Sequence, residues 1–129
     1  MKTKQIGDIG EAAAVKLLKK NGYKIIERNL HVSHNELDII AIHKKHKTIA
    51  FIEVKARTVD DDLYSRFGTP ASAVSREKQM RTIDAARAFL AKNSKYANLQ
   101  PRLDVIEVFL QKETFDILNM NHIENAFSV

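Results

Sequence analysis

The chain has 129 residues, a formal net charge of +5, an isoelectric point near 9.5 and no cysteine. This length suits one domain, and no apolar run approaches the roughly 20 residues that a membrane-spanning helix requires. The lack of cysteine excludes disulfides and thiolate catalysis and fits a reducing cytoplasm. We therefore expect a cytoplasmic protein whose basic character suits a polyanionic partner.

Hydrophobic periodicity predicts one helix and three strands in the first half of the chain. Residues 6–21 carry an apolar stripe with helical spacing, and Gly22 is suited to end that helix. Three segments have the composition of strands: residues 23–28, 36–43 and 48–57. Residues 57–69 contain three consecutive aspartates and a glycine, which predicts a loop.

The second half predicts a helix followed by two strands. A second apolar stripe places a helical region over residues 70–93, with Ser75 as its N-cap. The later segments are a linker over 93–101, strands over 102–110 and 114–118, and a short helix over 122–127. The order α-β-β-β-α-β-β predicts an α/β protein with a single domain over residues 1–129. Its central mixed five-stranded sheet would be flanked by helices.

Two acidic residues are predicted to face each other on the hairpin formed by the second and third strands. If His43 pairs with Thr48 across a four-residue turn, the register sets Asp38 opposite Glu53. Opposed side chains on antiparallel strands have Cβ atoms about 4.5–5.5 Å apart. A turn of three or five residues would instead place the two acids on opposite faces. The proposed site therefore depends on the length of this turn.

Opposed carboxylates repel each other, and a cation is the simplest way to offset the repulsion. Carboxylate oxygens suit Mg²⁺ or Mn²⁺, which bind one or two protein carboxylates together with water and phosphate. Lys55 shares a strand face with Glu53 and could activate water or stabilise charge on a phosphate. Glu11 lies on the apolar stripe of the first helix, where a carboxylate needs a ligand or a bonding partner. Both readings of Glu11 remain open at this stage.

The combination of Glu11, Asp38, Glu53 and Lys55 resembles the PD-(D/E)xK, or restriction-endonuclease-like, nuclease superfamily. More closely, the chain resembles the YraN-like family of uncharacterised bacterial proteins, which is related to archaeal Holliday junction resolvases. The matching segments are residues 7–11, 21–23, 28–29, 36–41, 51–57, Lys78 and residues 102–105. The resemblance implies a restriction-endonuclease-like core in which Asp38, Glu53 and Lys55 are catalytic and Glu11 completes the metal shell. The chain departs from the family pattern at Asn35, where glycine is usual, and at Leu103, where an aromatic residue is usual.

Four basic residues are candidates for contact with nucleic acid: Arg57, Arg76, Lys78 and Arg81. For the three on the predicted second helix, the alternative is a solvated helix face. These features predict a hydrolase that cleaves DNA phosphodiester bonds with Mg or Mn as cofactor, possessing endonuclease or exonuclease activity. Branched or structured DNA follows only from the resolvase relationship, and two symmetric cuts would require a homodimer.

Three alternatives remain open from the sequence. The chain could be a non-catalytic nucleic-acid-binding protein that retains the nuclease fold, could process RNA with the same site, or could have a purely structural role. The first predicts DNA affinity without cleavage, and the last predicts no salt-dependent binding of nucleic acid.

Overall fold

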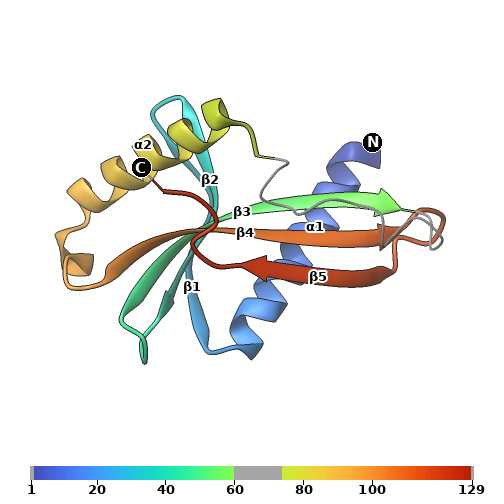
Figure 1. The fold of residues 1–129 in the computed structure, drawn as a ribbon, viewed down its shortest axis with the longest axis horizontal. Coiled ribbons are helices and arrows are strands. Elements are labelled where there is room, and N and C mark those ends of the chain that lie inside the picture. The colour runs from blue at the N-terminus through green and yellow to red at the C-terminus, as the bar shows by residue number, and fades with distance from the viewer. Residues whose placement is uncertain (1, 60–73, 129) are drawn as a thin grey trace.

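Five strands form one mixed sheet in the computed structural model, which describes residues 2–59 and 74–128. The strands are β1 (Tyr23–Val32), β2 (Asn35–His43), β3 (Thr48–Val59), β4 (Gln100–Gln111) and β5 (Ile117–Ile123). Their order across the sheet follows the chain, from β1 to β5 (Figure 1). β3 and β4 run parallel, whereas the other three neighbouring pairs are antiparallel.

Two long helices, α1 (Lys2–Lys20) and α2 (Arg76–Lys92), cover opposite faces of the sheet (Figure 1). A short 3₁₀ helix, η3 (Ser94–Tyr96), connects α2 to β4. Leu18 of α1 packs in one core cluster with Ile39 and Ile52, and Phe89 of α2 packs in a second cluster with Phe51. β2 and β3 are thus buried on both faces, which accounts for their nearly continuous apolar sequence. No helix in the described part of the chain is long and apolar enough to span a membrane.

The predicted α/β class, element order and five-stranded mixed sheet are confirmed. α2 begins at Arg76, and the Ser75 hydroxyl caps it by accepting a hydrogen bond from the Lys78 amide at 3.1 Å. Ser75 is therefore the N-cap, as predicted. Residues 70–73 of the predicted helix lie outside the described residues. β1 continues four residues beyond its predicted end, to Val32.

The predicted short helix over residues 122–127 is wrong. β5 begins at Ile117, three residues later than predicted, and extends to Ile123, so His122 lies in the sheet opposite Ile106. The next residues bond outward: the Asn125 amide donates to Asp104 and the Ala126 amide to the Leu103 carbonyl, at 2.9 and 2.8 Å. These amides then have no role left in a helix, and the burial of nearby Phe127 holds the segment against the core.

The closest approach between α1 and the sheet occurs at Gly10. A Cβ atom at this position would lie 2.5 Å from the Cβ of Ala56 on β3, far inside the contact distance of two carbons. Only glycine lets the helix backbone come this near without displacing β3. This approach sets the distance from the next helical residue, Glu11, to β3.

Candidate active site

The hairpin formed by β2 and β3 has the predicted register. Residues 44–47 form the four-residue turn, and His43 pairs with Thr48. The pairing continues to Ile39 and Ile52 and stops there in the described structure. We call this point the fork, because β3 continues beside β4 while β2 continues beside β1.

Asp38 and Glu53 come together at the fork, one step beyond the last paired residues. Asp38 Oδ2 accepts a hydrogen bond from the Val54 amide at 2.9 Å, so the side chain replaces a strand partner for β3. Burial, the charge of Glu53 and a hydrogen bond to Glu53 raise the pKa of Asp38 to about 7. The Val54 amide and Lys78 act in the opposite direction. The pair therefore shares a proton near neutral pH when no cation is bound.

Glu53 is buried and lies near a lysine of α2. Its Oε1 is 3.6 Å from the Nζ of Lys78, in the first turns of the helix that Ser75 caps. Sequence reasoning placed Lys78 among the nucleic-acid contacts, and the structure places it against a carboxylate of the site. The lysine partly neutralises the acidic pair in the protein without bound cations.

Glu11 is held at the wall of the site by two residues of β1. Its Oε2 accepts hydrogen bonds from Arg28 Nη2 at 3.1 Å and from Asn29 Nδ2 at 3.0 Å. Its other carboxylate oxygen, Oε1, is buried and has no hydrogen-bond partner. Asn29 has a left-handed backbone, with φ of 51°. The sequence did not indicate that β1 would supply both anchoring side chains, because they lie 17 and 18 residues away.

A hollow of about 660 Å³ opens between the N-terminal half of α1 and the fork. We call it the site hollow; its lining residues are Lys4, Ile6, Gly7, Asp8, Glu11, Asn29, Asp38, Val54, Lys55, Ala56, Arg57 and Thr58. Three of the four predicted catalytic residues, Glu11, Asp38 and Lys55, thus line one cavity. Glu53 lies beside Asp38 without lining it.

The predicted three-acid metal set is not assembled as one cluster. Within residues 2–59 and 74–128, no three acidic or histidine side chains lie close enough together to hold one ion. Asp38 and Glu53 form the pair, whereas Glu11 is engaged by Arg28 and Asn29 across the hollow. A site built on this pair would complete its coordination with water or phosphate, as Mg²⁺ sites commonly do.

Arg57, a predicted nucleic-acid contact, also lines the hollow and is fixed by a residue that sequence reasoning missed. Its Nε and Nη2 both donate to Glu107 Oε2 of β4, the former at 3.1 Å. Glu107 is fully buried, and its Oε1 has no hydrogen-bond partner. The available signal was an acid inside the apolar run of residues 105–110, similar to the one that singled out Asp38.

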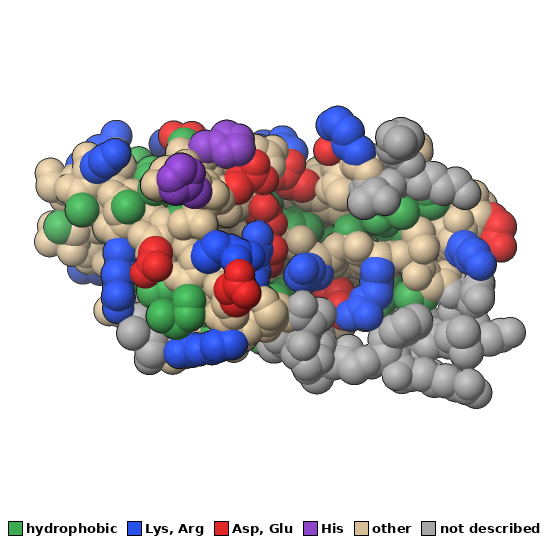
Figure 2. All heavy atoms as spheres, turned by 90° about the horizontal axis from the view of Figure 1, so that it is seen from above, with side chains coloured by type: hydrophobic (Ala, Val, Ile, Leu, Met, Phe, Trp, Pro, Cys, Tyr) green, Lys and Arg blue, Asp and Glu red, His purple; other side chains and the backbone are tan. Residues whose placement is uncertain are grey.

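The remaining two predicted contacts lie on α2, away from the site hollow. Arg81 donates to Glu77, and with Lys78 it lines a second hollow of about 210 Å³ beside the turn between β1 and β2. Arg76 is exposed and donates to Gln79 at 3.4 Å. Figure 2 shows acidic side chains gathered in the middle of one face, with lysine and arginine side chains around them.

The described geometry defines a small α/β protein with a carboxylate pair and a lysine at a strand fork. The chain belongs to the uncharacterised protein family UPF0102, which matches residues 10–108. A UPF0102 protein of Caldanaerobacter subterraneus is 40% identical over 124 residues, covering 96% of this chain and 95% of the relative. One of Alkaliphilus oremlandii is 42% identical over 125 residues, covering 96% and 98%. One of Caldicellulosiruptor saccharolyticus is 37% identical over 127 residues, covering 98% and 100%.

Proposed function

We propose that this protein is a nuclease that hydrolyses DNA phosphodiester bonds with the help of Mg²⁺ or Mn²⁺. The observation that carries the proposal is the pairing of Asp38 and Glu53 at the fork, directly beside a hollow lined by Lys55. Two buried carboxyls in contact are unfavourable unless a proton or a cation joins them. The resemblance of the same residues to the PD-(D/E)xK superfamily supports this reading.

The donor set fits a divalent cation. Asp38 and Glu53 offer hard carboxylate oxygens, and Glu11 adds a buried oxygen without a hydrogen-bond partner at the wall of the hollow. Asp38 and Glu53 would hold the ion, which supplies polarisation of the phosphoryl group and a lowered pKa of bound water. The Lys78 ammonium, 3.6 Å from Glu53, would then be released toward phosphate because the cation replaces its charge.

The side chains of the hollow have separate roles in this proposal. Lys55 donates hydrogen bonds to a phosphate oxygen and stabilises the negative charge that develops during hydrolysis. Arg57, held by Glu107, presents a second positive charge for the neighbouring phosphate. Glu11, anchored by Arg28, orients water on the α1 side. A volume of about 660 Å³ accommodates a phosphate with its adjoining sugars.

The substrate is proposed to be DNA, with branched or structured DNA as the first forms to examine. The net charge of +5 and the lysine and arginine side chains around the acidic centre suit a polyanion (Figure 2). On α2, Lys78 and Arg81 line the second hollow and would contact flanking phosphates. Arg76, exposed at the start of the same helix, would extend this row.

The experiment is a cleavage screen on branched, nicked, duplex and single-stranded DNA with matched RNA, in Mg²⁺, Mn²⁺ or EDTA. Wild type should cleave DNA only with metal, and Asp38→Asn and Lys55→Met should lose at least a hundredfold in rate. Asp116→Asn, which removes an exposed acid outside the hollow, is the matched control and should cleave normally. DNA binding without cleavage of any substrate would replace the proposal with a non-catalytic binding protein. Preferential cleavage of RNA would change the substrate class.

A further inference from the structure

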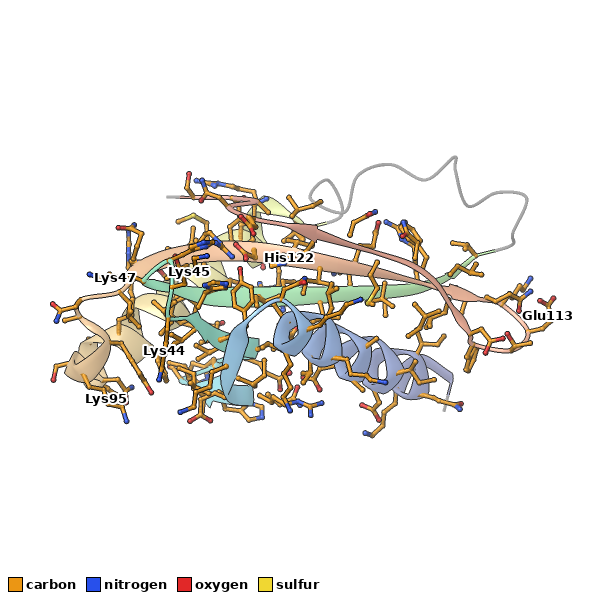
Figure 3. All side chains as sticks on the ribbon, turned by 90° about the horizontal axis from the view of Figure 1, so that it is seen from below. Lys44, Lys45, Lys47, Lys95, Glu113 and His122 are labelled. Atoms are coloured by element: carbon orange, nitrogen blue, oxygen red, sulfur yellow. The ribbon has the colours of Figure 1, made fainter. Side chains whose placement is uncertain are left out.

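Four lysines gather at one end of the molecule, away from the site hollow. Lys44, Lys45 and Lys47 lie on the turn between β2 and β3, and Lys95 lies on η3 (Figure 3). All four are exposed, and Figure 3 shows them at the end opposite the turn that carries Glu113. We call this set the lysine surface.

The backbone beneath the lysine surface is fixed. The Lys47 amide donates to the Lys44 carbonyl at 3.1 Å, and the Lys47 carbonyl accepts from the Gln100 amide at 2.8 Å. The ring of His46 stacks on His43 at 4.2 Å between centroids. Lys47 itself has φ of 50°, a left-handed conformation that is unusual for lysine. These contacts join the turn to the start of β4, so the lysines are presented on a firm base.

The lysine surface has no acidic counterpart. Residues 39–52 and residues 85–103, which build this end, contain no aspartate or glutamate. In the described part of the chain, none of the four lysines forms an ion pair. The nearest acids beyond these segments at the start of β4, Asp104 and Glu124, are both paired with Arg102. A group of like charges that repel one another without compensation suits a partner that supplies the negative charge.

The spacing along β2 relates the lysine surface to the site hollow. Six residues separate Asp38 from Lys44, which corresponds to about 20 Å along an extended strand. Duplex DNA advances about 3.4 Å per base pair, so this distance spans roughly six base pairs. A duplex held at the fork would therefore reach the lysine surface within half a helical turn.

We propose that the lysine surface is a second DNA-backbone contact, which holds the duplex about six base pairs from the bond that is cleaved. This inference rests on the proposed nuclease function and adds the direction in which the substrate extends. It also predicts that duplexes shorter than about ten base pairs bind weakly, because they cannot occupy both contacts at once.

The test measures DNA affinity by fluorescence anisotropy in the Asp38→Asn background, which prevents cleavage. The variant carries Lys44→Gln, Lys45→Gln, Lys47→Asn and Lys95→Gln; asparagine is chosen at 47 because it tolerates a left-handed backbone. Each lost phosphate contact lowers the slope of log affinity against log salt by about 0.9. We expect the slope to fall by about 3 and the affinity for a 30-base-pair duplex to fall at least tenfold.

The matched control removes the same charge elsewhere, through glutamine at the exposed residues Lys16, Lys19, Lys20 and Lys112. The control should change the slope by less than 1 and keep the preference for long duplexes. Equal effects of the two variants would overturn the lysine surface and leave the nuclease proposal standing. Absence of DNA binding in every variant would instead contradict the nuclease proposal itself. In the active protein, the lysine-surface variant should cleave an eight-base-pair duplex at the wild-type rate while KM rises for the long one; lost cleavage of both would also overturn the inference.

Discussion

The Asp38 carboxyl titrates in two different ranges in the folded and unfolded chain. Its pKa rises from 3.8 to about 7 on folding because burial and Glu53 both disfavour its charged form. Between about pH 4 and pH 7 the folded state therefore binds one more proton than the unfolded state. The free energy of unfolding must then fall as pH rises through this range. The decrease is up to roughly 4 kcal/mol, since one pKa unit corresponds to about 1.4 kcal/mol.

Asp38→Asn should remove this decline in metal-free buffer. The asparagine oxygen can still accept from the Val54 amide, but it carries no charge to repel Glu53. At pH 8 in EDTA we expect the variant to be more stable than wild type by about 2–4 kcal/mol. At pH 5 the two should be within about 1 kcal/mol. Urea denaturation at both pH values measures the difference, and a variant less stable than wild type at pH 8 would contradict the assigned cause.

Glu107 offers a second test at the residue scale. Glu107→Gln weakens two charge-assisted hydrogen bonds to Arg57 in a fully buried position, and we expect a loss of about 1–3 kcal/mol in urea denaturation. The pair Glu107→Leu with Arg57→Met should recover most of this loss, because buried ion pairs can be replaced by apolar residues. Cleavage should remain impaired in the double variant. Full cleavage without Arg57 would show that the guanidinium does not contact substrate.

The acids that could be found from sequence were those in unexpected surroundings. Asp38 stood out because aspartate is rare in an apolar strand, and its pairing with Glu53 followed from the turn length. Glu107 carried a comparable signal, but nothing in the sequence linked it to Arg57 across 50 residues. The partners of Glu11 were hidden for the same reason, since side-chain contacts between distant segments depend on the completed fold.

At the scale of the elements, the contact between α1 and β3 at Gly10 can be tested by adding one methyl group. Gly10→Ala places a Cβ 2.5 Å from that of Ala56, and the strain should exceed the gain of up to about 1 kcal/mol in helix propensity. We expect a net loss of about 1–3 kcal/mol and impaired cleavage, because Glu11 shifts with the helix. Gly7→Ala is the control on the same helix: its Cβ meets nothing within 4 Å. That variant should be as stable as wild type or slightly more stable, whereas equal effects of both would contradict the close-contact explanation.

Local patterns predicted most elements but failed where tertiary contacts decide. The hairpin register was predictable because a four-residue turn and two apolar strands allow only one arrangement of buried faces. The residues after His122 looked helical, yet their amides bond to Asp104 and Leu103. A sequence window of a few residues contains neither partner, so the loss of the helix could not have been predicted.

At the scale of the whole molecule, the two helices bring three distant parts of the chain to the fork. α1 carries Glu11, the hairpin carries Asp38 and Lys55, and α2 supplies Lys78 from the other face of the sheet. The acidic centre within a basic protein would attract phosphate only after a cation has neutralised the carboxylates. Metal binding is therefore expected to precede productive DNA binding.

The most direct measurement is Mn²⁺ binding by calorimetry to wild type and Asp38→Asn, at pH 8 and pH 6. We predict one Mn²⁺ per chain for wild type and loss of binding in the variant. Affinity should be about tenfold lower at pH 6, because Asp38, with a pKa of about 7, must lose its proton before it can bind the ion. If wild type binds no Mn²⁺ even with duplex DNA present, or Asp38→Asn binds it equally well, the paired carboxyls at the fork are not a metal site.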